Sequence, residues 1–158
     1  MRIIEDGAVV EDRWTRLEVD APVPATGAVL VPLATWRAQR DVLAARGDVG
    51  VWLEPDEELD AIVEDLDVLA SIAFHFPRFA DGRPYSRARL LRERYEYDGP
   101  VRAFGDVLRD QVHYLHRCGF DVLEIRHDRD PEDALAGLSD FSVALQPAAQ
   151  EPPSPAQR

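Results

Sequence analysis

Short apolar segments alternate with helix-length segments along most of the chain, and this alternation limits the fold more than any other feature. Strands are predicted at residues 28–32 (AVLVP), 49–53, 68–76, 101–104 and 121–125, with a further candidate at 141–145. Helices are predicted at 33–46, 56–66, 85–95, 107–118 and 131–138. Strands that alternate with helices of about ten residues form right-handed βαβ units, which build a parallel sheet. The units are too few for a complete eight-stranded barrel, so we expect an α/β domain whose mostly parallel sheet is open or resembles half a barrel.

The two ends of the chain depart from this pattern. The start is typical of a short β-hairpin, because Asp6 and Gly7 form a turn signal between two apolar pairs. Prolines mark APVPAT (21–26) as a linker, and the tail QPAAQEPPSPAQR has the proline-rich, apolar-poor composition of a disordered segment. We therefore expect an N-terminal extended segment and linker at 1–26, a single α/β domain at 27–145 and a disordered tail at 146–158.

Charge and composition argue against several classes of function. The formal net charge of −12 disfavours nonspecific binding to nucleic acid, which needs a basic surface, and docking on anionic lipid. No apolar run approaches the length of a membrane span and the start lacks a signal-peptide core, so the expected location is the cytoplasm. Cys118 is the single cysteine, which excludes an internal disulfide and a multi-thiolate metal site. It is typical of a small buried group; a thiol activated by the neighbouring Arg117 is the alternative.

Arginines gather around the loop at 77–84 (PRFADGRP) and the start of the helix that follows it. In parallel α/β proteins such loops lie at the edge of the sheet where ligands bind. Arg83, Ser86 and Arg89 would bind an oxyanion there through guanidinium groups, a hydroxyl and the free N–H groups of the helix start. The structural alternative is a solvated helix face, in which Asp81 pairs with Arg83 or caps the helix.

A second group of charged residues surrounds the strand at 101–104. Arg102 lies within that strand and needs a partner if it is buried, for which Asp106, Asp110 and Glu124 are candidates. A buried pair would be structural, whereas a pair open to a cleft would join the anion site. Asp106 is suited to capping the next helix, and with Asp110 four residues later it is also a candidate for acid–base catalysis.

The sequence contains no motif that identifies a cofactor. There is no third carboxylate or histidine spaced to complete a metal site with the two aspartates, and no His-Glu-x-x-His motif, so the histidines are interpreted as incidental. A P-loop, a Gly-x-Gly-x-x-Gly turn and a Gly-x-Ser-x-Gly elbow are also missing from the sequence. We therefore predict neither a metal nor an organic cofactor.

Two long segments, FADGRPYSRARLLRERY (79–95) and VRAFGDVLRDQVHYLHRCGFD (101–121), resemble a bacterial family called domain of unknown function 934. The resemblance covers about residues 53–145. It implies a connection with sulfate assimilation, because members are encoded beside the sulfite reductase haemoprotein and adenylylsulfate reductase. Members also carry the label of an oxidoreductase of sulfite reduction, but the family has no agreed catalytic residues to transfer.

Two functions from different classes are consistent with these features. In the first, the chain is an accessory or partner protein of sulfate and sulfite reduction that docks on the sulfite reductase haemoprotein, with the acidic helix at 56–66 as the docking element. In the second, it is an enzyme or sensor that binds a small oxyanion such as sulfite, or a sulfonucleotide. The anion would be bound by Arg83, Ser86, Arg89 and Arg102, with Asp106 or Asp110 as the base.

Overall fold

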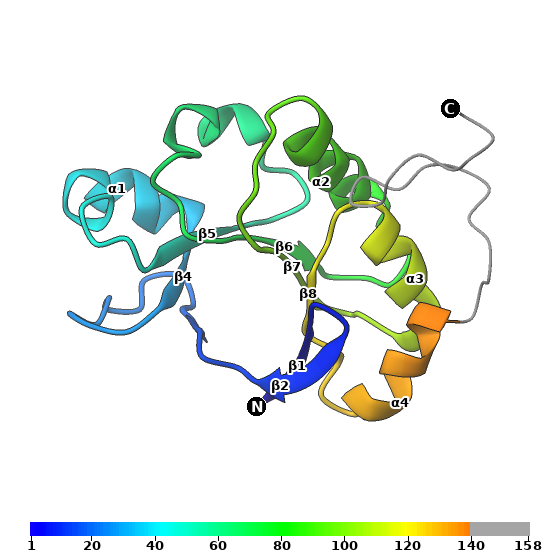
Figure 1. Ribbon diagram of the computed structural model, residues 1–158. Helices are drawn as coiled ribbons and strands as arrows, with labels where there is room; N and C mark the ends of the chain where they lie inside the picture. The colour runs from blue at the N-terminus through cyan, green and yellow to red at the C-terminus, as the bar shows by residue number, and fades with distance from the viewer. Residues whose placement is uncertain (140–158) are drawn as a thin grey trace.

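A computed structural model describes residues 1–139, and in them one mixed sheet curls into an open half-barrel (Figure 1). The strands are β1 (Arg2–Glu5), β2 (Ala8–Glu11), β3 (Thr15–Arg16), β4 (Val29–Pro32), β5 (Val49–Leu53), β6 (Ile72–Phe76), β7 (Val101–Gly105) and β8 (Val122–Leu123). Their order in the sheet is β2-β1-β8-β7-β6-β5-β4-β3. Neighbours from β3 to β8 are parallel, while β1 is antiparallel to both β8 and β2. The α/β class, the mostly parallel half-barrel sheet and the N-terminal hairpin are thus confirmed.

The helices cover the outer face of the curled sheet (Figure 1). They are α1 (Leu33–Leu43), α2 (Arg83–Glu93), α3 (Arg109–Arg117) and α4 (Pro131–Leu135). The 3₁₀ turns η1 (Leu59–Ala61) and η2 (Val63–Asp65) lie between β5 and β6, and η3 (Ala136–Ser139) follows α4. The candidate strand at 141–145 and the tail at 146–158 lie outside the described residues. The hairpin and β3, which the sequence assigned to a separate extended segment, pair in the same sheet as β4–β8.

Both faces of the sheet are buried, as alternate side chains in β6 illustrate. Ile72, Phe74 and Phe76 point outward into a large apolar core beneath the helices, whereas Ala73 points inward to a small cluster with Phe104 and others. Successive side chains of a strand point to opposite faces, so a parallel strand covered on both sides has a nearly continuous apolar sequence. This explains why IAFHF in β6 and VGVWL in β5 lack a polar–apolar alternation.

The chain itself bridges the open side of the half-barrel. Strands β2 and β3 lie at opposite edges of the sheet, yet residues 12–14 connect them directly. In this connection Trp14 packs against the inner apolar cluster, which includes Trp52 and Phe104. The rings of Trp52 and Phe104 make an edge-to-face contact, with their centroids 5.7 Å apart. The inner face is therefore filled by side chains near this connection.

The predicted acidic helix at 56–66 is wrong: this segment forms the two 3₁₀ turns η1 and η2, separated at Ile62. An α-helix would stack Asp56, Asp60 and Glu64 on one face at four-residue spacing, where like charges destabilise it. The 3₁₀ turns also allow Asp65 to turn inward, where its carboxylate accepts a hydrogen bond of 2.8 Å from the indole of Trp36.

Candidate functional site

Arg102 lies on the inner face of the sheet, within a buried network of charges. Its side chain is 3% exposed and makes two hydrogen bonds of 2.8 Å to the carboxylate of Asp12 and one of 3.3 Å to Glu124. Arg16 also binds Glu124, at 2.9 Å, and its guanidinium lies 4.1 Å from the ring centroid of Phe104. The sequence predicted Glu124 as a partner of Arg102, but it did not predict Asp12.

The charges of this network neutralise one another inside the protein. Burial raises the pKa of Asp12, but hydrogen bonds from Arg102 and from the backbone N–H of Trp14, together with the charge of Arg102, outweigh burial and hold that pKa below its usual value. Asp12 stands in the connection that bridges the half-barrel, so the network fastens this connection to β7. Of the two alternatives that the sequence left open for Arg102, a buried structural pair or a pair open to a cleft, the structure shows the buried pair.

The three other predicted anion ligands lie on the outer side of the sheet, on α2. Arg83 forms a bidentate pair with Asp81 through Nε and Nη2, at 3.1 and 2.8 Å. The hydroxyl of Ser86 donates to the backbone carbonyl of Arg83, and Arg89 pairs with Glu93 at 3.1 Å. All of these groups already have partners within the protein.

The structure does not bring Arg102 together with the arginines of α2. Ala103, its neighbour in β7, belongs to the outer core beneath the helices, so Arg102 points to the opposite face. The four residues predicted to bind one anion are therefore divided between two sides of the sheet.

Asp106 connects loops at the carboxyl edge of the sheet. One of its carboxylate oxygens accepts a hydrogen bond from the backbone N–H of Phe79 and the other from Arg126, both at 2.8 Å. It does not cap α3, which begins at Arg109 with Leu108 in the N-cap position. The helix start is instead capped by Gln111, whose side chain accepts a hydrogen bond from the N–H of Leu108.

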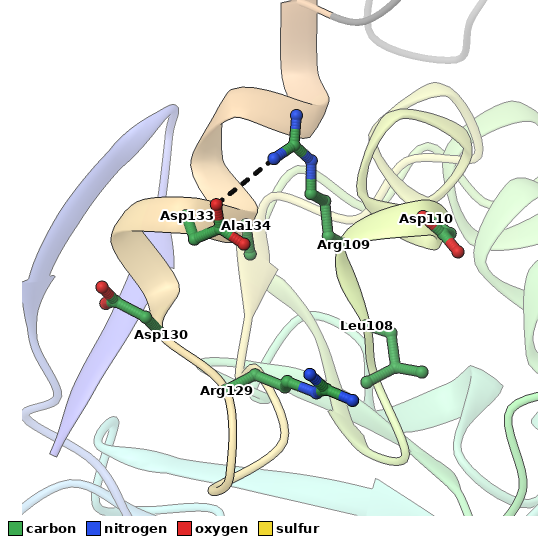
Figure 2. A pocket seen from close by; sticks show the side chains of 7 residues that line it. All are labelled: Leu108, Arg109, Asp110, Arg129, Asp130, Asp133 and Ala134. Atoms are coloured by element: carbon green, nitrogen blue, oxygen red, sulfur yellow. Dashed lines mark hydrogen bonds and ion pairs between the residues drawn. The ribbon is translucent and has the colours of Figure 1, made fainter.

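Asp110 lines a pocket between the start of α3 and α4 (Figure 2). The pocket has a volume of about 240 Å³ and is lined by Leu108, Arg109, Asp110, Arg129, Asp130, Asp133 and Ala134. Arg109 and Asp133 form an ion pair of 3.3 Å across one side of it. Asp106 and Asp110 share no hydrogen-bond partner in the part of the chain that the structure describes, and each belongs to a different set of contacts.

Sequence reasoning missed a carboxylate–histidine pair on the inner face, next to the carboxyl edge. Oε2 of Glu54 lies 2.8 Å from Nδ1 of His75. The imidazole stacks on Phe104 with a centroid distance of 4.9 Å and an interplanar angle of 13°. When Nδ1 carries the proton, the carboxylate of Glu54 accepts a hydrogen bond from it and Nε2 is left as a proton acceptor, which is the arrangement of a general base.

A signal for this pair was present in the strands. Trp52 and Ala73 are opposite each other in β5 and β6, so the residues two positions later, Glu54 and His75, fall on the same face at the same level. The register of the two strands could not be read from the sequence, and the pair was therefore not predicted.

Within residues 1–139, no group of three or more His, Cys, Asp or Glu side chains is placed to hold a metal ion. Cys118 is buried, and Nη2 of Arg89 lies 3.9 Å from its sulfur. None of the helices described is both long and apolar enough to cross a membrane.

Comparison with models of known protein families finds a match, which covers most of the βα units. The family model described as bacterial protein of unknown function (DUF934) matches residues 50–155, which begin in β5 and include the loops that follow β6 and β7. The chain belongs to this family. No curated protein matches it.

Proposed function

We propose that this member of the DUF934 family is an accessory protein of assimilatory sulfate and sulfite reduction that docks on the sulfite reductase haemoprotein. The observation that carries the proposal is the acidic segment, residues 54–67, which connects β5 to η1, η2 and the approach to β6. It contains no basic residue. Its exposed carboxylates are those of Asp56, Glu58, Asp60, Glu64 and Asp67.

The acidic segment is suited to docking because most of its exposed charge is not neutralised within the protein. Glu58 pairs with Arg87 at 3.1 Å, whereas Asp60, Glu64 and Asp67 have no ion pair among the residues that the structure describes. Free surface charge of one sign attracts a partner of the opposite sign and raises the rate of association. The expected partner surface is therefore basic.

The alternative function, an enzyme or sensor that binds a small oxyanion or a sulfonucleotide, has less support. Arg83, Arg89 and Arg102 each bind a carboxylate of the protein itself, so an incoming anion would have to displace that carboxylate. The link to sulfite reduction rests on the family resemblance and its gene neighbourhood, and the oxidoreductase label has no cofactor motif behind it.

Binding of the purified haemoprotein, measured by isothermal titration calorimetry over a range of salt concentrations, tests the proposal. We expect binding that weakens steadily as salt rises, because exposed charges are screened beyond a Debye length of about 10 Å at 0.1 M ionic strength. The variant Asp60→Asn, Glu64→Gln, Asp67→Asn should bind more weakly at low salt and lose most of the salt dependence.

A matched control changes the same amount of charge away from the acidic segment. Asp20→Asn, Glu96→Gln, Asp98→Asn alters three exposed carboxylates in other loops and should bind like the unmodified protein. Equal weakening in both variants would show that only net charge matters. Binding that does not depend on salt, or no binding, would contradict the docking role.

A further inference from the structure

We infer that the pocket between α3 and α4 binds a small zwitterion, and that its ligand class is the α-amino acids with short side chains. This inference concerns a ligand and is independent of the docking role proposed above. It rests on the position of the pocket, on its size, and on two exposed side chains of opposite charge, Arg129 and Asp110, that form no hydrogen bond or ion pair with other groups of residues 1–139.

The pocket is formed by two consecutive loops at the carboxyl edge of the sheet. Leu108 and Asp110 follow β7, and Arg129 and Asp130 follow β8, its parallel neighbour. Ligands of parallel α/β proteins bind outside the carboxyl ends of the strands, where adjacent loops supply the contacts. The pocket therefore lies at the edge of the sheet where ligands of such folds bind.

Most charges that line the pocket are engaged with other protein groups. Asp133 pairs with Arg109, as the dashed line in Figure 2 shows. Asp130 accepts a hydrogen bond from the N–H of Glu132 at 3.0 Å and pairs with Arg2 at 3.4 Å. The carboxylates of Asp130 and Asp133 are therefore held by other groups of the protein.

Two side chains of opposite charge are left without such contacts. Within residues 1–139, neither the guanidinium of Arg129 nor the carboxylate of Asp110 forms a hydrogen bond or an ion pair. Figure 2 shows the Arg129 side chain extending from its loop toward Leu108, while Asp110 lies in the first turn of α3. One free cation and one free anion in the same pocket match a ligand that carries both an anionic and a cationic group.

The chemistry of the walls sets how such a ligand would lie. Its carboxylate would bind Arg129, beside the positive end of the α3 dipole, and its ammonium would bind Asp110. Asp130 and Asp133 add negative charge, which disfavours sulfate and other simple anions. Leu108 and Ala134 provide an apolar wall for a short side chain.

The size of the pocket limits the ligand further. Its volume of about 240 Å³ lies below the roughly 300 Å³ at which pockets for drug-sized ligands begin. The pocket is too small for a nucleotide but has room for glycine, alanine or serine.

The test uses the full chain, labelled with nitrogen-15, titrated with alanine and with two probes that each carry half of its charge: acetate for the carboxylate and methylammonium for the ammonium. We expect alanine to shift the backbone signals of residues 108–110 and 129–134 in a saturable manner. Each single-charge probe should bind at least about tenfold more weakly, because it satisfies one of the two free side chains.

Charge-removing variants complete the test. Arg129→Gln and Asp110→Asn should each weaken alanine binding about tenfold or more, whereas Arg78→Gln and Asp98→Asn, which change exposed residues outside the pocket, should leave it unchanged. The inference is overturned if alanine produces no saturable shifts, if acetate or sulfate binds as tightly as alanine, or if the pocket variants bind alanine like the controls.

Discussion

Replacing Arg102 by methionine should destabilise the fold strongly, because it leaves the buried carboxylate of Asp12 without its cation and removes one of the two arginines that bind Glu124. The side chains of Asp12 and Glu124 are 3% and 11% exposed, and Arg102 makes three hydrogen bonds to them. Removing one partner of a buried ion pair costs about 3–5 kcal/mol. For a domain of this size, that loss lowers the melting temperature by on the order of 10 °C.

The loss should also depend on pH in a defined direction. In the unmodified protein the pKa of Asp12 is held below its unfolded value, so the pair stabilises the fold above the unfolded pKa, and this contribution is lost as pH falls through the folded pKa. In the Arg102→Met variant the hydrogen bond and the charge of Arg102 no longer lower the pKa of Asp12, and the backbone N–H of Trp14 remains to oppose burial, so this pKa rises. The difference in free energy of unfolding should therefore be largest near neutral pH and should shrink in acid, when Asp12 binds a proton.

Urea unfolding followed by circular dichroism at several pH values measures this difference. Arg2→Met is the matched control, because Arg2 pairs with Asp130 at 3.4 Å and both side chains are exposed, at 48% and 56%. Exposed pairs contribute little, so we expect this control to unfold nearly like the unmodified protein. If Arg102→Met unfolds like the control, or if its deficit does not change with pH, the network does not fasten the bridge as described.

Three further substitutions test other parts of the structure by thermal and urea unfolding. Gly105→Ala should destabilise the fold by about 1–3 kcal/mol from backbone strain alone, because Gly105 has φ +103°. An added Cβ would also lie 2.4 Å from the carbonyl oxygen of Phe76. Unchanged stability would show that the turn can relax. Tyr97→Phe should cost about 0.5–1.5 kcal/mol, since the buried hydroxyl donates a hydrogen bond of 2.9 Å to the carbonyl of Leu69; a neutral effect would mean that this bond adds nothing. Burial raises the pKa of Asp121, so its contribution is present below the unfolded pKa and is lost as pH rises through the folded pKa. Asp121→Asn should therefore lose less stability than the unmodified protein as pH rises through that range, and an equal loss would contradict this assignment.

The fold could be predicted from the sequence where the composition of a segment directly reflects its burial in the folded protein. Apolar strands such as β5 and β6 are buried on both faces, so their composition identified them without knowledge of their neighbours. The segment at 56–66 was mispredicted because its apolar spacing favours an α-helix, while the repulsion among its carboxylates and the inward turn of Asp65 are stronger.

The candidate site was harder to predict, because its contacts join residues that are distant in sequence. Arg102 was correctly expected to need a partner, but its main partner, Asp12, is 90 residues away. Arg83 and Arg89 were grouped with Arg102 because arginines are concentrated in this stretch of an otherwise acidic chain. Which face of the sheet each arginine occupies depends on strand register and curvature, which a single sequence does not contain.

Hydrogen–deuterium exchange of the protein, with and without the sulfite reductase haemoprotein, tests the proposed docking role most directly. The account predicts slower exchange in the acidic segment on complex formation, and the loss of that protection in the Asp60→Asn, Glu64→Gln, Asp67→Asn variant. Protection confined to other surfaces, or the same exchange in the presence and absence of the haemoprotein, would contradict it.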